Sequence, residues 1–230
     1  MFTLTVLVPA FNEEDTIIDS LTRLSKLSIF EEVLVIDDCS TDDTYKLASK
    51  FVANDNRFKL IKTKNNIGKG GALSTAKDFI QSDYVVIHDA DLEYFPEDIV
   101  EMSKHVINNE NTLILGSRFI GDKKRKNIYT RTLFANKVMS AFFSSVNGCK
   151  ITDVATCYKL MPASFFKEVD IKEMGFAFEI EIIAKFLKQS RAIQEVPIKY
   201  EGRSYDEGKK IKTSDGFRYL ITTVKYRFYN

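Results

Sequence analysis

The chain has 230 residues, of which 44% are hydrophobic and 28% are charged. This length suits one sizeable α/β domain, and the composition is typical of a folded protein and argues against a disordered one. The formal net charge of +1 argues against nucleic acid as a partner, because nucleic-acid-binding proteins usually carry a strongly basic surface.

Three further features bear on the compartment. Cys39, Cys149 and Cys157 are odd in number and widely spaced, which fits neither a disulfide framework nor a metal-ligand pair and favours the reducing cytoplasm. Residues 1–6 are typical of a first strand and lack the features of a signal peptide. No apolar run approaches the ~20 residues that span a bilayer, so we expect any membrane contact to be peripheral.

The first half of the chain alternates β-rich runs with amphipathic segments. This pattern predicts a single α/β domain with a doubly wound, mostly parallel, Rossmann-like sheet. Strands are expected at residues 4–8, 32–36, 58–62, 84–88 and 112–116, and helices at 14–27, 42–54, 69–81 and 96–108. Ser40 or Thr41 is the expected cap of the second helix, which would place Asp42 and Asp43 at the positive end of its dipole.

The pattern changes after Arg118. A basic run at residues 123–126 leads into an apolar helix expected at 128–146, and a second amphipathic helix is expected at 216–229. Each is compatible with a core helix or with a helix that lies on a membrane. Arg131, Lys137 and the basic run support the second interpretation.

Acidic residues follow three of the predicted strands, at positions 13–14, 37–38 and 89–93. Ligands of open parallel sheets bind beyond the carboxyl ends of the strands. Any one of these segments is compatible with a helix cap or a solvated loop, but three together predict a common site.

Asp89 and Asp91 are two positions apart, so on an extended segment their side chains point the same way. Mg²⁺ and Mn²⁺ take carboxylate oxygens together with substrate phosphates. Glu93 continues the spacing and is a candidate third ligand. The sequence therefore predicts a metal site that holds a diphosphate, although this short motif is weak outside its strand context.

Glycines at positions 68, 70 and 71 precede a predicted helix. Backbone amides in such a loop can approach phosphate, and Lys69 would add charge; a simple tight turn is the alternative. Basic residues later in the sequence are candidate phosphate-binding groups, although each such residue is by itself more often an ordinary surface residue. They are Arg118, Arg131, Arg203, Lys209 and Lys210.

The histidines are His88 and His105, and no Ser-His-Asp or Cys-His arrangement is evident. Covalent hydrolase chemistry is therefore disfavoured. We interpret His88 as structural.

Four motifs in order resemble the signature of family 2 glycosyltransferases with the GT-A fold. They occupy residues 8–14, 37–42, 65–70 and 89–91, and the resemblance continues through segments near 116–118, 152–159, 175–179 and 195–205. It covers nearly the whole chain. The later motifs are most similar to the branch that transfers mannose or glucose to dolichyl or other polyprenyl phosphates. Phe11 stands where tyrosine is more usual, and Cys39 where glycine is more usual.

The resemblance implies roles for individual residues. The nucleotide sugar would be held by Pro9, Phe11, Glu13, Ile36, Asp38, Lys69, Asp89, Ala90, Arg203 and Lys209. Mg²⁺ or Mn²⁺ would be bound by Asp89, Asp91 and Glu93, and the acceptor phosphate by Arg118 and Arg131. The predicted catalytic set is Asp91, Arg118, Arg131 and Asp153. Within the single domain 1–230, residues 1–118 would hold donor and metal, and 119–230 would face acceptor and membrane.

The implied activity is inverting transfer of a hexose to a polyprenyl phosphate at the cytoplasmic face of a membrane. The donor would be UDP-glucose or otherwise GDP-mannose. The acceptor phosphate is already anionic, so positioning and electrostatic stabilisation would carry the reaction. A membrane-embedded partner is a further expectation, because the chain itself has no predicted span.

Three alternatives stay open. A family member that acts on a saccharide or another lipid would need a carboxylate base, and Asp153, Glu179 and Glu181 are its candidates. A non-catalytic nucleotide-sugar-binding or scaffold subunit and a nucleotidyltransferase are weaker alternatives. The acidic set Asp38, Asp89 and Asp91 argues against the first of these two, and the lack of a glycine-rich start after the first strand argues against the second.

Overall fold

A computed structural model of the chain describes residues 2–106, 111–123, 125–127, 130–189, 192–203 and 213–229, with the side chains of 130, 131 and 213–215 outside the description. Its main sheet has the strand order β3-β2-β1-β4-β7-β5-β8. Only β7 runs antiparallel to its neighbours within this sheet, so the prediction of a mostly parallel α/β fold is confirmed. The strands are β1 (Leu4–Ala10), β2 (Glu32–Asp37), β3 (Phe58–Lys62), β4 (Tyr84–Ile87), β5 (Thr112–Ser117), β7 (Lys159–Pro162) and β8 (Ala192–Pro197).

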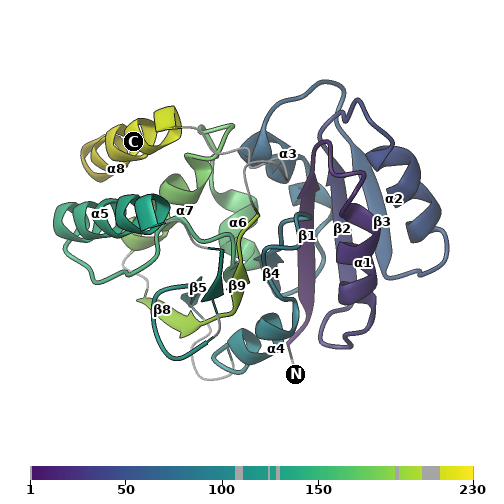
Figure 1. Ribbon diagram of the computed structural model, residues 1–230, viewed down its shortest axis with the longest axis horizontal. Helices are drawn as coiled ribbons and strands as arrows, with labels where there is room; N and C mark the ends of the chain where they lie inside the picture. The colour runs from purple at the N-terminus through teal and green to yellow at the C-terminus, as the bar shows by residue number, and fades with distance from the viewer. Residues whose placement is uncertain are drawn as a thin grey trace.

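Helices cover the sheet, and a two-stranded parallel ribbon of β6 (Arg125–Lys126) and β9 (Tyr200–Glu201) lies apart from it. The helices are α1 (Ile17–Ser25), α2 (Thr44–Val52), α3 (Lys69–Thr75), α4 (Glu97–Ser103), α5 (Thr130–Asn147), α6 (Ala163–Glu168), α7 (Phe178–Lys188) and α8 (Thr213–Phe228). The helix expected at 69–81 ends at Thr75 and is followed by the 3₁₀ turn η1 (Lys77–Phe79). Figure 1 shows α5, α7 and α8 at the end of the molecule away from α1 and α2.

The expected cap of the second helix is wrong. Helix α2 begins at Thr44, and its first amide donates to Oδ1 of Asp42 at 3.0 Å. Ser40 instead accepts a hydrogen bond from the amide of Asn12 at 3.0 Å. The side chain of Ser40 thus joins the loop after β2 to the loop after β1.

The register of the central strands brings the predicted site together. Ala10 pairs with Asp37, and Leu7 pairs with Ile87, in parallel ladders of β1 with β2 and with β4. The carboxyl ends of these three adjacent strands therefore lie at one edge, as the sequence predicts.

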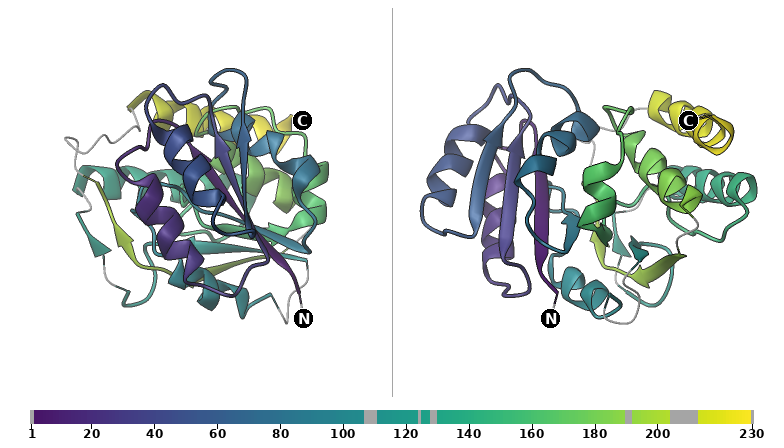
Figure 2. Two further views of the ribbon diagram at one scale, coloured as in Figure 1. Left: turned by 90° about the vertical axis from the view of Figure 1, so that its right-hand side faces the viewer. Right: turned by 180° about the vertical axis from the view of Figure 1, so that it is seen from behind.

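The two apolar helices of the second half pack against each other, and Figure 2 shows them side by side from two further directions. Each has one buried face, with Phe143 on α5 and Tyr219 and Tyr226 on α8. Their outer faces expose large apolar side chains: Phe134, Val138, Phe142, Phe217, Ile221, Val224 and Phe228. In the described part of the chain, no helix has the length and apolar character to cross a membrane. The sequence left two interpretations open, a core helix or a helix on a surface. In the structure, each helix has one face in the core and one face on the surface.

Gly70 gives a test of the packing around α3. Alanine is the better helix former by about 1 kcal/mol, yet a Cβ here would lie 2.1 Å from the carbonyl oxygen of Glu173. We expect Gly70→Ala to lower the free energy of unfolding by about 1–3 kcal/mol, because backbone must move to make room. Chemical denaturation measures the change.

Gly175→Ala is the matched control, since a Cβ there meets nothing within 4 Å. Equal stability of Gly70→Ala and the unmodified protein would contradict the close approach.

Candidate active site

The ends of β1, β2 and β4 open into a cavity of about 1240 Å³. Residues from both halves of the chain line it. Those predicted to act at the site and found there are Pro9, Phe11, Glu13, Asp38, Lys69, Asp89, Ala90, Asp91, Glu93, Arg118 and Arg203. Ile36 is fully buried inside β2 and does not line the cavity, so that part of the prediction is wrong. Lys209 and Lys210 and the side chain of Arg131 lie outside the described residues.

The carboxylate of Asp38 holds the loop that leads into α3. It accepts hydrogen bonds from the hydroxyl of Thr63 at 3.1 Å and from the amides of Ile67 and Gly68 at 3.0 and 2.7 Å. The amides of Gly70 and Gly71 donate to the carbonyl of Met174 at 2.7 and 3.3 Å. These amides face protein acceptors, so the expectation that they cradle phosphate is wrong.

Lys69 joins two acidic segments of the cavity. Its ammonium group lies 2.8 Å from Asp89 and 2.6 Å from Glu179. Glu179 also pairs with Lys159, which is completely buried. Burial lowers the pKa of Lys69, but Asp89 and Glu179 outweigh it and hold the pKa well above its ordinary value. Lys69 therefore stays charged and neutralises its neighbours.

The predicted metal ligands have a different geometry from the one expected. Ala90 and Asp91 lie in a turn and Leu92 has a positive φ of 63°, so this segment is not extended. Both oxygens of Glu93 are engaged, with Tyr200 Oη and the amide of Arg203 each at 2.7 Å. Among the described residues no group of three His, Cys, Asp or Glu side chains is arranged to hold a metal. The structure thus does not support Glu93 as a third ligand.

Asp91 nevertheless lies in a site that suits a divalent cation. Burial, Asp89 and Glu93 raise its pKa to about 8, against the opposing effect of Arg203. This crowding of negative charge favours a cation, and Mg²⁺ is often bound through one or two carboxylates plus substrate phosphates. Asp89 and Asp91 fit that pattern.

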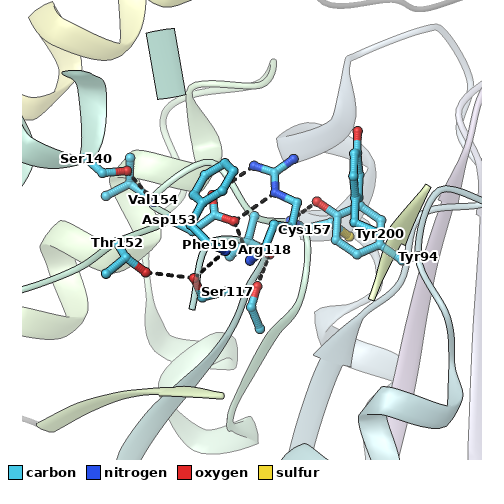
Figure 3. Close-up of polar contacts among 12 residues, drawn as sticks. Tyr94, Ser117, Arg118, Phe119, Ser140, Thr152, Asp153, Val154, Cys157 and Tyr200 are labelled. Atoms are coloured by element: carbon cyan, nitrogen blue, oxygen red, sulfur yellow. Dashed lines mark hydrogen bonds and ion pairs between the residues drawn. The ribbon is translucent and has the colours of Figure 1, made fainter. Parts of the chain in front are cut away.

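Arg118 lines the cavity, and Figure 3 shows the polar contacts that hold it in place. Its Nε and Nη2 donate to the two oxygens of Asp153, both at 2.8 Å, and its amide donates to the same carboxylate. The guanidinium also lies over the ring of Tyr200, 5.0 Å from the centroid. Asp153 is fully buried and does not line the cavity, so its predicted place among the catalytic residues is wrong: it orients Arg118.

Three residues at or behind the cavity wall near Arg118 were not predicted from the sequence. Tyr94 and Tyr200 line the cavity beside Arg118, and Glu195 accepts the amides of Thr152 and Asp153 at 2.9 and 3.1 Å. Glu195 thereby fixes the turn that presents Asp153. An isolated tyrosine or glutamate belongs to no recognisable motif. The roles of these three residues depend on contacts with residues far away in the sequence.

The structure also shows the environment of His88 and the backbone conformation of Cys39. His88 is buried between the hydroxyls of Ser20 and Tyr158, and burial lowers its pKa to about 4, which supports the structural interpretation. Cys39 has a φ of 58°, in the left-handed region that glycine adopts without strain. This backbone conformation explains why glycine is the more usual residue there.

Comparisons with known proteins place this fold and site. Solved structures that share the architecture include the glucosyl-3-phosphoglycerate synthase of Mycobacterium tuberculosis in complex with Mn²⁺, UDP and phosphoglyceric acid. The TM-score is 0.71 at 21% identity, covering 98% of this chain and 78% of that one. The fold is therefore that of GT-A glycosyltransferases.

The model of glycosyl transferase family 2 matches residues 5–170, and the chain belongs to this family. Among its relatives is the UDP-N-acetylglucosamine–dolichyl-phosphate N-acetylglucosaminyltransferase of Methanococcus voltae, 28% identical over 93% of this chain and 91% of the relative. Another is the undecaprenyl-phosphate mannosyltransferase of Micrococcus luteus, 26% identical over 88% of this chain and 85% of the relative.

The Arg118–Asp153 pair gives a stability test. Asp153→Ala would leave a buried guanidinium without its counter-ion, so we expect the free energy of unfolding to fall by about 3–5 kcal/mol. The double variant Asp153→Ala with Arg118→Met removes the stranded charge and should recover much of the loss. Denaturant titration of both proteins checks this, and a single variant within about 1 kcal/mol of the unmodified protein would contradict the role of the pair.

Proposed function

We propose that this protein is a metal-dependent, inverting hexosyltransferase that transfers the sugar of a nucleotide sugar to a polyprenyl phosphate at the cytoplasmic face of a membrane. UDP-glucose is the first donor to test and GDP-mannose the second. The names of the two relatives, which include dolichyl and undecaprenyl phosphate, support the acceptor class. The metal would be Mg²⁺ or Mn²⁺.

One observation carries the choice of a phosphate acceptor: each carboxylate considered as a base is already paired. Asp153 forks with Arg118, and Glu179 lies between Lys69 and Lys159. Glu181 is fully buried and accepts the amides of Lys172 and Glu173. A sugar hydroxyl needs a base when it attacks, whereas a phosphate oxygen is already anionic. The arrangement therefore favours a phosphate.

The residues divide the task by position. Asp89 and Asp91 would hold the metal, which supplies positive charge to the departing diphosphate when bound. Arg118, oriented by Asp153, would place the acceptor phosphate for attack on the anomeric carbon from the side opposite the leaving group. Inversion of the anomeric configuration follows, and catalysis rests on alignment and electrostatic stabilisation.

The outer faces of α5 and α8 support a place on a membrane surface. Phe217 and Phe134 are 73% and 70% exposed, and Phe228 is 68% exposed. Large apolar groups in contact with water favour burial in a lipid interface, and basic side chains nearby favour anionic headgroups. Arg218 and Lys225 of α8 are such basic groups, with side chains 60% and 45% exposed. They share one carboxylate, Glu173, so this cluster keeps a net positive charge. A membrane-embedded partner would add a second anchor.

The decisive experiment measures release of nucleoside diphosphate from UDP- and GDP-sugars with Mn²⁺, with and without a short polyprenyl phosphate. We expect acceptor-dependent UDP release from UDP-glucose. Asp91→Ala should lower turnover at least about 100-fold, because the metal loses a ligand at the leaving group. Asp78→Ala removes an exposed carboxylate and should keep full turnover.

Other outcomes of this assay separate the alternatives. Turnover only with saccharide acceptors would favour a family member that acts on sugars, and release of pyrophosphate would favour a nucleotidyltransferase. Absence of turnover with every pair of donor and acceptor would favour a binding or scaffold subunit.

Membrane contact has its own test. The double variant Phe217→Ser and Phe228→Ser should weaken co-sedimentation with anionic vesicles about tenfold or more, because two exposed rings lose their burial. Phe79→Ser is the control, since Phe79 is 48% exposed but lies on η1, outside α5 and α8. Equal binding of both variants would contradict the assigned face.

A further inference from the structure

The guanidinium of Arg203 lies between Glu13 and Asp91, and Asp91 is one of the two carboxylates that would hold the metal. Its Nη1 and Nη2 donate to the two oxygens of Glu13 at 3.0 and 3.2 Å. Nη2 also lies 3.4 Å from Oδ2 of Asp91. One monovalent cation thus contacts the acidic segment after β1 and the acidic segment after β4, and all three side chains line the cavity.

The backbone of Arg203 is fixed beside this cluster. Its amide donates to Glu93 at 2.7 Å, and the amide of Gly202 donates to the carbonyl of Lys126 at 3.1 Å. A Cβ on Gly202 would lie 2.9 Å from the carbonyl oxygen of Asn127, so the chain passes close to its neighbour there. The backbone contacts thus hold the amide of Arg203 beside Glu93, while its side chain reaches Glu13 and Asp91.

One nitrogen of Arg203 lacks an acceptor. Nε is buried and makes no hydrogen bond with any residue that the structure describes. A buried donor without an acceptor is costly, and gaining one is favourable. A phosphate oxygen is a suitable acceptor, because the planar guanidinium binds phosphate through adjacent nitrogens.

We propose that Arg203 and the divalent cation compete for Asp91, so that the cation binds weakly by itself and enters together with the donor diphosphate. This inference rests on the proposed function. A cation at Asp91 would lie close to the guanidinium, and like charges repel strongly in a partly buried site. The diphosphate removes this conflict, because its oxygens can accept from Arg203 while they share the cation with Asp91.

The test measures Mn²⁺ affinity directly, by calorimetry or from the electron spin resonance signal of free Mn²⁺, with and without UDP. Without UDP, Arg203→Ala should bind Mn²⁺ at least about tenfold more tightly than the unmodified protein, because the competing charge is gone. With UDP present, the order should reverse, because the variant lacks the contact to phosphate. UDP should therefore enhance Mn²⁺ binding far more in the unmodified protein than in the variant.

Lys126→Ala is the matched control. It removes one positive charge from β6, where the side chain of Lys126 is 64% exposed and pairs with Glu201. Its Mn²⁺ affinity should stay within about twofold of the unmodified protein, because an exposed charge outside the cavity is screened by salt. Arg203→Gln, which keeps a polar side chain without the charge, replaces Arg203→Ala if the alanine variant fails to fold.

Two results would overturn the inference in distinguishable ways. Mn²⁺ affinity without UDP that is the same in the unmodified protein and in Arg203→Ala, while UDP still promotes binding, contradicts the competition and leaves the proposed function intact. Failure of the unmodified protein to bind Mn²⁺ with or without UDP contradicts the metal requirement, and the inference falls with it.

Discussion

The geometry of the cavity depends on one buried ammonium group. Lys69 Nζ lies 2.8 Å from Asp89 and 2.6 Å from Glu179. This one nitrogen therefore links the loop after β4 to helix α7. Lys69 and Glu179 are 110 residues apart in the sequence. Removal of one partner from a buried ion pair costs about 3–5 kcal/mol, because the remaining charge is uncompensated. The donor side and the second half of the chain are therefore fixed relative to each other by charge.

The backbone reinforces this arrangement and extends it to the surface. The carbonyl of Met174 accepts the amides at the start of α3, while the preceding Glu173 accepts hydrogen bonds from Arg218 and Lys225 of α8. Glu173 and Met174 thus connect α8 with the start of α3, where Lys69 lies. The loop amides are engaged by Asp38 and Met174. Under the proposed function, side chains would therefore bind the phosphates, and the arginines of the cavity are suited to this task.

Local patterns predicted the fold, and long-range pairings decided the site. The strand predicted at 58–62 and the acidic residues predicted at the ends of β1, β2 and β4 are where the sequence placed them. These predictions succeed because strand periodicity and strand ends are properties of short segments. The Arg118–Asp153 fork and the Tyr200–Glu93 hydrogen bond join residues 35 and 107 positions apart, and no local pattern encodes them. The extended geometry expected for Asp89 and Asp91 is wrong because Ala90 and Asp91 lie in a turn.

The two arginines of the cavity differ in a way that suits different tasks. Arg118 is 7% exposed, forks onto the fully buried Asp153 and stacks on Tyr200. Its position is set before any ligand arrives, which is what a group that aligns an attacking phosphate requires. Arg203 instead forks onto Glu13 and reaches Asp91, two carboxylates that themselves line the cavity, and its Nε lacks an acceptor in the described part of the chain. Under the proposed function, a fixed cation such as Arg118 would define the direction of attack. A cation that exchanges partners, such as Arg203, would respond to the arrival of the leaving group.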